Sequence, residues 1–272
     1  MAEAQRSKGD SMMKTAIVVF DIDGVIRDVG GSYRRAIADT VEHFTGGASR
    51  PTLTDIDYLK SEGIWNNDWE ASQELVYRYF EAQGQARTGI SLNYQHLIDF
   101  FQSRYRGPDP EQWTGYIGSE PLLCTPNYFK NLTENQMLWG FFSGAMRDEA
   151  LYVLQGKLNL GIPVLRAMED VPGKPDPTGL FEVIAELETE ENQQTPVLYV
   201  GDTVADLYTV TKAKQQQPER FWIGVGVLPP HIQQADLERR QTYQQNLEKA
   251  GATIVLNQLE ELTPAKIKDL IS

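Results

Sequence analysis

Two aspartates follow an apolar run near the start of the chain. Residues 18–28 read VVFDIDGVIRD, in which Asp21 and Asp23 stand one residue apart where the run ends. Alternate residues of a strand point the same way, so both carboxylates are expected just past its carboxyl end, where open α/β sheets place their ligands. Gly24 allows the backbone to turn sharply there. The pattern fits an Asx-turn that closes the strand, or a pair of charges that needs a compensating partner.

A second apolar run also ends in carboxylates. Within residues 197–207, VLYVGDTVADL, Asp202 follows the run directly and Asp206 lies on the first turn of the expected helix. Each aspartate alone could be a helix N-cap or a favourable acidic residue at the positive helix end. Two strands that both end in carboxylates would crowd like charges into one crevice. We therefore expect a hard divalent cation between them, and Mg²⁺ prefers oxygen ligands of this kind.

Two further loops could bind a phosphoryl group. Lys174 lies in GKPDP at residues 173–177, between an expected strand and helix, where it could project a fixed positive charge into the crevice. The same pattern also fits an ordinary surface lysine. Ser143 and Gly144 follow another apolar run, and a serine hydroxyl with backbone N–H groups at a helix start can cradle phosphate oxygens. A lone helix cap would also explain this serine.

Short apolar runs rich in β-branched residues predict the strands that position these groups. After residue 140 the runs alternate with helical patterns, which is typical of βαβ units and a parallel sheet in an α/β fold. The strands are expected at 15–20, 137–142, 164–168, 197–200, 221–227 and 253–256. Helices are expected at 147–157, 177–187 and 204–214, with a last helix that begins at Thr263 and Pro264.

Residues 32–118 have a different pattern. Helical periodicity recurs at 33–44, 68–82 and 94–105, with little strand character between these segments. The simplest interpretation is a helical subdomain inserted after the first strand, with a return to the sheet near Pro121. The expected organisation is a disordered leader at 1–13, an α/β core at 14–31 and 119–272, and a helical cap at 32–118.

The composition excludes several classes of partner. The net charge of −13 argues against nucleic acid or an anionic membrane surface. A single cysteine, Cys124, rules out an internal disulfide and suits a reducing cytosol, so we expect a cytoplasmic protein. No stretch approaches the ~18 consecutive apolar residues of a membrane span, and the polar leader lacks the apolar segment of a secretory signal.

The ordered set DIDGV, FFSG, GKPDP and GDTVAD resembles the four motifs of the haloacid dehalogenase-like (HAD) superfamily. The motifs span Asp21 to Asp206, and the resemblance covers the chain after the leader. It implies a Rossmann-like parallel sheet with helices on both faces. The helical insert resembles the small α-helical cap of the phosphoglycolate-phosphatase-like subfamily.

The resemblance implies catalytic roles for four residues. Asp21 would be the nucleophile that forms an aspartyl-phosphate, and Asp23 would be the general acid and base. Ser143 and Lys174 would hold the transferring phosphoryl group. These roles describe a Mg²⁺-dependent phosphatase that acts on a small phosphorylated metabolite.

The resemblance also implies a magnesium site. The carboxylates of Asp21 and Asp202 would hold the ion together with the backbone carbonyl of Asp23. Asp206 would support the site through a water or through Lys174.

Asp23 distinguishes between branches of the superfamily. Dehalogenases lack an acid at this position because halide leaves without a proton, and phosphonate-cleaving members have a small residue there. A phosphomutase of the β-phosphoglucomutase type uses the same aspartates and remains an alternative. A non-catalytic binding or assembly protein on the same fold is a second alternative.

The sequence says little about the substrate. Arg27 could contact an anionic substrate group or pair with a surface acid. At residues 66–69, NNDW, the asparagines could cap the following helix with Trp69 packed inside; alternatively, Asn67 and Lys60 could face the crevice and bind the substrate. The sequence also leaves open whether the chain is a monomer or a homodimer.

Overall fold

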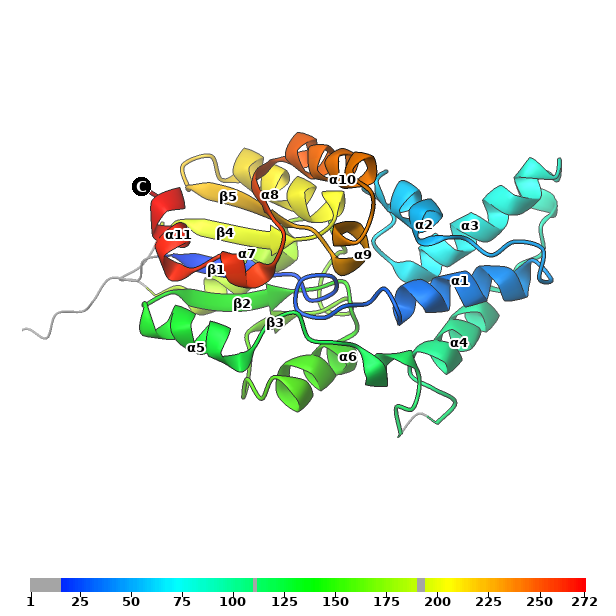
Figure 1. Ribbon diagram of the computed structural model, residues 1–272, viewed down its shortest axis with the longest axis horizontal. Coiled ribbons are helices and arrows are strands. Elements are labelled where there is room, and N and C mark those ends of the chain that lie inside the picture. The colour runs from blue at the N-terminus through cyan, green and yellow to red at the C-terminus, as the bar shows by residue number, and fades with distance from the viewer. Residues whose placement is uncertain (1–15, 110–111, 190–193) are drawn as a thin grey trace, which may run out of the picture.

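A six-stranded parallel sheet forms the centre of the computed structural model, which describes residues 16–109, 112–189 and 194–272 (Figure 1). The strands are β1 (Ile17–Phe20), β2 (Leu138–Phe142), β3 (Leu165–Arg166), β4 (Val197–Gly201), β5 (Trp222–Val227) and β6 (Ala252–Leu256). Each coincides with a predicted run, although β3 keeps only two residues of the run at 164–168. Thr15 and the leader expected at 1–13 lie outside the described residues.

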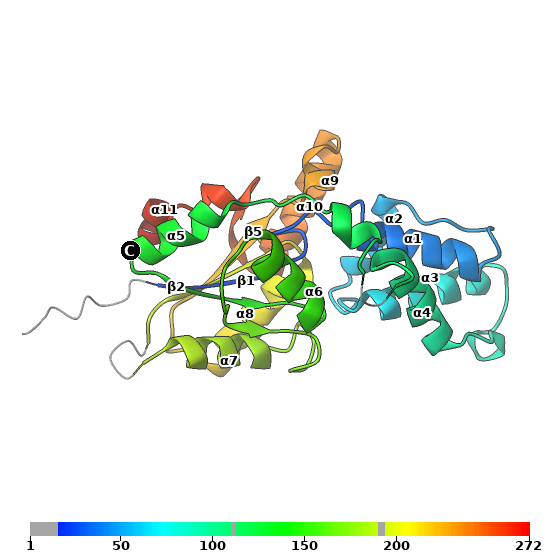
Figure 2. The ribbon, with the colours of Figure 1, turned by 90° about the horizontal axis from the view of Figure 1, so that it is seen from below.

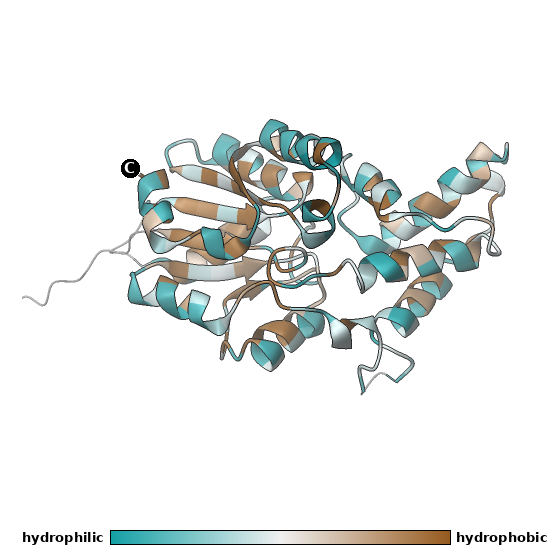
Figure 3. Ribbon diagram, viewed as in Figure 1, coloured by the Kyte–Doolittle hydropathy of each residue, from teal (hydrophilic) through white to brown (hydrophobic). Residues whose placement is uncertain are grey.

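The strand order is β3-β2-β1-β4-β5-β6, and helices cover both faces (Figure 2). The core helices are α5 (Pro126–Glu134), α6 (Arg147–Leu151), α7 (Thr178–Leu187), α8 (Val204–Gln216), α9 (Pro230–Gln233), α10 (Leu237–Ala250) and α11 (Pro264–Leu270). Val18 and Phe20 of β1 pack with α5, α6 and α11, whereas Ile17 and Val19 pack with α7 and α8. Because β1 is buried on both faces, its sequence is a continuous apolar run, and Figure 3 shows apolar strands between helices with polar outer faces.

An α-helical cap is inserted after β1 and lies beyond the carboxyl ends of the strands (Figure 1). Its helices are α1 (Tyr33–Phe44), α2 (Leu53–Lys60), α3 (Asp68–Ala82) and α4 (Tyr94–Tyr105). They pack around an apolar core of their own that includes Ile37, Val76 and Phe101. The predicted bounds of α1, α3 and α4 are confirmed, whereas α2 was not predicted. The domain boundaries expected at 31/32 and 118/119 stay predictions.

The two segments that join the cap to the core run side by side. The N–H of Leu123 donates to the carbonyl of Ile26 at 2.8 Å, and the N–H of Asp28 donates to the carbonyl of Pro121 at 2.9 Å. The chain therefore enters and leaves the cap at one place, next to the loop that carries Asp21 and Asp23.

The core helices agree only in part with the predicted ones. The predicted helix at 147–157 begins as α6 and continues as a π-helical segment at Tyr152–Lys157. The N-terminus of α11 is as predicted, because the Thr263 side chain accepts a hydrogen bond from the Lys266 N–H. Helices α5, α9 and α10 were not predicted. None of the helices in the described parts of the chain is long and apolar enough to cross a membrane.

Candidate active site

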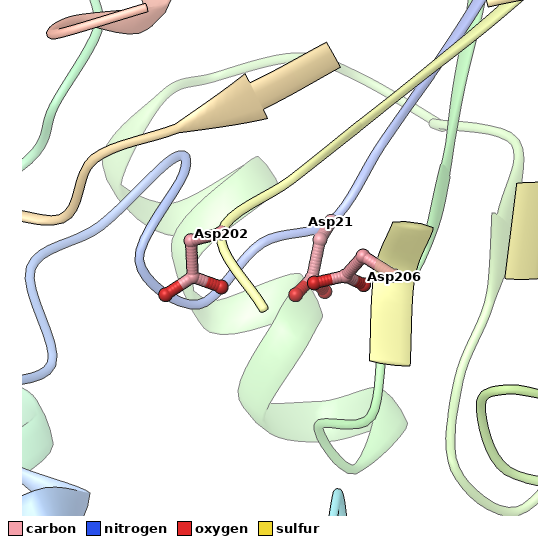
Figure 4. A group of neighbouring side chains, drawn as sticks. All are labelled: Asp21, Asp202 and Asp206. Carbon is pink, nitrogen blue, oxygen red and sulfur yellow. The ribbon is translucent and has the colours of Figure 1, made fainter. Parts of the chain in front are cut away.

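Three aspartates converge at the carboxyl ends of β1 and β4 (Figure 4). The two strands are neighbours in parallel register, with Phe20 opposite Val200, so the residues that follow each strand lie side by side. One carboxylate oxygen each of Asp21, Asp202 and Asp206 lies within 4.8 Å of the other two. The predicted crowding of carboxylates from two strands is thus present in the structure.

Gly24 makes this convergence sterically possible. Its φ is +77°, which favours glycine, and a Cβ there would lie 2.1 Å from Asp202 Oδ2. Any side chain at this position would therefore push the loop after β1 away from Asp202.

Lys174 connects two of the carboxylates. Its Nζ lies 2.7 Å from Asp21 Oδ1 and 2.7 Å from Asp206 Oδ1, and the residue is 4% exposed. The interpretation of Lys174 as a surface lysine is therefore wrong. Asp206 is held by further donors, because the Tyr199 hydroxyl donates to Oδ1 at 3.2 Å and the Thr203 hydroxyl donates to Oδ2 at 2.6 Å. Asp206 thus fixes the position of the lysine, as one of the two predicted roles requires.

Tyr199 is a site residue that the sequence analysis missed. It lies in the middle of β4 and is fully buried, and its hydroxyl also lies 3.0 Å from the carbonyl oxygen of Phe142, so its one proton is shared between this oxygen and Asp206 Oδ1. A tyrosine in an apolar strand looks like a core residue. The one available signal is its hydroxyl, which needs a partner when the strand is buried on both faces.

Asp202 is a buried carboxylate without a partner. It is 2% exposed, and within the described ranges no hydrogen bond or ion pair reaches its carboxylate. Burial raises its pKa well above the usual value, and the charges of Asp206 and Asp21 raise it further. Burial likewise raises the pKa of Asp21 to about 7, although Lys174 opposes the shift. One lysine thus faces three carboxylates, and this excess of buried negative charge fits a bound metal cation.

Ser143 and Gly144 lie at the end of β2, beside this cluster. Ser143 is buried, and its Oγ accepts a hydrogen bond from the Ala145 N–H at 3.1 Å. The serine does not cap α6, whose N-cap is Met146. A Cβ on Gly144 would lie 2.5 Å from Nδ2 of Asn66, so this cap residue sits directly over the glycine.

Arg27 contacts Asp23. The two expected alternatives, contact with an anionic substrate group or with a surface acid, are therefore wrong. Arg27 is fully buried; its Nε lies 2.5 Å from Asp23 Oδ1, and its Nη1 lies 2.9 Å from Glu120 Oε2. Asp23 therefore has a fixed orientation. Burial raises the pKa of Glu120 to about 7, although the charge of Arg27 opposes the shift.

The cap residues divide between the two alternatives. Asn67 caps α3, since its Oδ1 accepts hydrogen bonds from the N–H groups of Trp69 and Glu70, and Trp69 packs against the cap core. Lys60 does not reach the crevice beside Ser143; its Nζ lies 2.8 Å from Asp68 Oδ1. The expectation that Lys60 binds the substrate is thus not supported by its position.

A cavity of about 350 Å³ separates the cap from the loops after β2 and β3. Ser143, Gly144 and Lys174 line one side, and Asn66 and Asn67 line the other. Asn67 therefore combines its capping role with a place in the cavity wall. A phosphorylated molecule placed here would reach the phosphate-binding candidates and the cap together.

A second feature missed by the sequence analysis lies outside the four motifs. Asp57 of α2 is surrounded by Arg34 Nη1 at 2.6 Å, His231 Nε2 at 3.0 Å and Arg239 Nη2 at 2.5 Å. Arg34 belongs to the cap, whereas His231 and Arg239 belong to α9 and α10. The cluster therefore joins the cap to the core. Sequence spacing gives no sign of it, because the partners lie up to 182 residues from Asp57 along the chain.

Comparisons with known proteins fit this geometry. The family model for haloacid dehalogenase-like hydrolases matches residues 15–213. The chain is also 30% identical over 256 residues to an imidazoleglycerol-phosphate dehydratase of Phytophthora nicotianae, a match that covers 91% of this chain and 52% of that protein. The chain thus spans about half the length of this relative.

Solved structures share the fold. A phosphatase of Thermococcus thioreducens is 20% identical and has a TM-score of 0.57, and the match covers 77% of this chain and 92% of that one. CbbY of Rhodobacter sphaeroides, in complex with phosphate, is 15% identical and has a TM-score of 0.59. The match covers 92% of this chain and 96% of that one.

Proposed function

The chain belongs to the haloacid dehalogenase-like hydrolases, and we propose that it is a Mg²⁺-dependent phosphatase that hydrolyses a small phosphorylated metabolite. The observation that carries the proposal is the position of Asp21. Its carboxylate lies at the end of the central strand, 2.7 Å from a buried lysine and beside an unpaired buried aspartate. Such an arrangement suits a nucleophile that must stay ionised while it approaches an anionic phosphoryl group.

The first step transfers the phosphoryl group to the protein. Ser143 and Lys174 hold the phosphoryl oxygens, and an oxygen of the Asp21 carboxylate attacks phosphorus. The bond between phosphorus and the ester oxygen breaks, and Asp23 gives its proton to that oxygen. Arg27 contacts Oδ1 of Asp23, which leaves Oδ2 to carry the proton.

The second step regenerates the enzyme. Asp23 takes a proton from a water molecule as that water attacks the aspartyl-phosphate, and inorganic phosphate leaves while Asp21 becomes a free carboxylate again. Asp21, Asp202 and the Asp23 backbone carbonyl would hold Mg²⁺, which, when bound, supplies positive charge against the phosphoryl oxygens.

The direct test is release of inorganic phosphate from p-nitrophenyl phosphate in the presence of Mg²⁺. We expect turnover by the wild type and a loss of at least about a thousandfold for Asp21→Asn, because the nucleophile is removed. Asp269→Asn, an exposed aspartate on α11, is the matched control and should keep full activity. Equal rates for Asp21→Asn and the wild type would contradict the proposal.

A panel of phosphate esters then separates the alternatives. A mutase would convert a sugar phosphate to its isomer without release of phosphate, and a binding protein would turn over no ester. We include imidazoleglycerol phosphate in the panel because the Phytophthora relative is named for that compound. The relative's other half offers room for the dehydratase, so we assign only ester hydrolysis to the part shared with this chain.

We further propose that the protein acts in the cytoplasm on a small molecule, with neither nucleic acid nor a membrane as partner. The net charge of −13 argues against both polyanionic partners, and the single cysteine suits a reducing compartment such as the cytoplasm.

A further inference from the structure

A second, smaller cavity adjoins the first, on the leaving-group side of the site. It has a volume of about 30 Å³, and Asp23 lines it. Gly144 and Met168 line both cavities. If phosphate binds at Ser143 and Lys174, a group attached to the ester oxygen next to Asp23 enters this small cavity. Its volume is enough for about two water-sized groups, so only a compact end group fits.

The wall of the small cavity is acidic. Asp23, Asp68 and Glu149 all line it, and no lysine, arginine or histidine of the described chain does. Each of these carboxylates has a cationic partner: Arg27 lies 2.5 Å from Asp23, Lys60 lies 2.8 Å from Asp68, and Arg106 lies 2.7 Å from Glu149. None of the three cations lines the cavity, so a ligand there meets the carboxylates and not their partners.

Two polar groups in the wall lack partners. Gln102 Oε1 is buried and accepts no hydrogen bond, although its amide nitrogen lies 3.3 Å from Glu149 Oε1. Tyr33 is 7% exposed, and within the described residues its hydroxyl makes no hydrogen bond. A buried carbonyl oxygen without a donor is costly, which indicates that a ligand supplies the donor.

Aromatic rings complete the wall. Trp69 and Phe101 line the cavity beside Tyr33 and Tyr105. Aromatic faces attract cations and offer nothing to an anion, so they favour the same type of ligand as the carboxylates do.

From these observations we propose that the leaving group of the substrate carries a small cationic nitrogen, as in an amino-alcohol phosphate. The nitrogen would donate to Gln102 Oε1 and lie beside Asp68 and Glu149. The inference rests on the proposed phosphatase activity and narrows its substrate class.

Three two-carbon phosphate esters that differ only in their end group provide the test. These are phosphoethanolamine with an ammonium, 2-hydroxyethyl phosphate with a hydroxyl, and 2-phosphoglycolate with a carboxylate. We expect kcat/KM to be at least about tenfold higher for the ammonium ester than for the hydroxyl ester, because a buried hydrogen bond to a charged group is lost. The carboxylate ester should be the poorest substrate of the three.

A variant then assigns the preference to the cavity. Gln102→Met removes the free carbonyl oxygen and should lower the ammonium-to-hydroxyl ratio about tenfold. Gln95→Met makes the same change on the exposed side of α4 and should leave the ratio unchanged. The ratio compares two substrates on one preparation, so a partial loss of folded protein cancels.

The outcomes separate this inference from the activity on which it rests. Hydrolysis of p-nitrophenyl phosphate without a preference for the ammonium ester overturns the inference and leaves the phosphatase standing. If Gln102→Met keeps the preference for the ammonium ester, the cavity is not the source of that preference. No hydrolysis of any ester overturns both.

Discussion

Asp202 shows how a single side chain can be unfavourable for the fold and useful for the chemistry. It is buried next to two other carboxylates, and in the described part of the chain no hydrogen bond or ion pair reaches its carboxylate. A cation held between Asp202 and Asp21 would remove this repulsion. The free energy of unfolding should therefore depend on the metal.

We predict that Asp202→Asn stabilises the metal-free protein by on the order of 1 kcal/mol, because a neutral amide of equal size replaces an unpaired buried charge. Mg²⁺ should raise the Tm of the wild type and have little effect on the variant. Thermal unfolding with EDTA and with excess Mg²⁺ measures both effects. A variant with the same Mg²⁺-dependent shift as the wild type would exclude Asp202 as a ligand.

At the residue scale, the positions of the motif residues could be predicted, but the side chains that hold them in place could not. Asp21, Asp202 and Lys174 could be predicted because short spacings fix them at strand ends, and the register of β1 and β4 brings the two aspartates together. Arg27 and Tyr199 act through contacts that spacing does not encode. Arg27 reaches Asp23 from a loop, and the Tyr199 hydroxyl reaches Asp206 from a strand, so only the folded chain shows these partners.

At the scale of elements, the width of the apolar face distinguishes the predicted cap helices α1, α3 and α4 from the unpredicted α10. Helices α1, α3 and α4 bury one side against a common core, which gives a clear periodicity. Helix α10 buries only Leu247 and Ala250 among its 14 residues, so its sequence is polar almost all round. Its position is set instead by contacts with its neighbours, and a single sequence does not show these.

We expect the cap to move as a unit on the paired segments that join it to the core, near Gly30 and Gly31. A Cβ on Gly31 would meet nothing within 4 Å, so Gly31→Ala should fold normally while it restricts the backbone. We predict a several-fold loss of turnover, with the Mg²⁺-dependent rise in Tm preserved. Gly89→Ala, also in open space but in the cap, is the control. Steady-state kinetics on p-nitrophenyl phosphate measure the turnover of both variants. Equal turnover of Gly31→Ala and Gly89→Ala would disprove the hinge.

At the scale of the whole molecule, the cluster around Asp57 fastens the cap to the core. Burial alone would raise the pKa of Asp57, but the hydrogen bonds from His231 and Arg239 and the charge of Arg34 hold it well below the usual range. Tyr243, Tyr33 and Asp202 are further titratable groups beside this cluster. A lowered folded-state pKa means that the stabilisation is present above the unfolded-state value near 4 and is lost as the pH falls below it.

We predict that Asp57→Asn lowers the free energy of unfolding by about 3 kcal/mol at pH 7, because buried Arg34 loses its partner. The difference between variant and wild type should shrink as the pH falls from 5 towards 3. Urea unfolding at several pH values gives this comparison directly. A difference that is constant with pH would show that the Asp57 charge does not contribute.

The side-by-side entry and exit of the cap, at Asp28 and Pro121, also has a consequence for how such a protein can change over time. An insertion whose two ends are neighbours can grow, shrink or be exchanged without a shift in the strand ends that carry the reactive aspartates. Tyr33, Asp68 and Gln102 of the small cavity belong to this insertion, so part of the wall that would select the substrate can be altered while the reactive aspartates are kept.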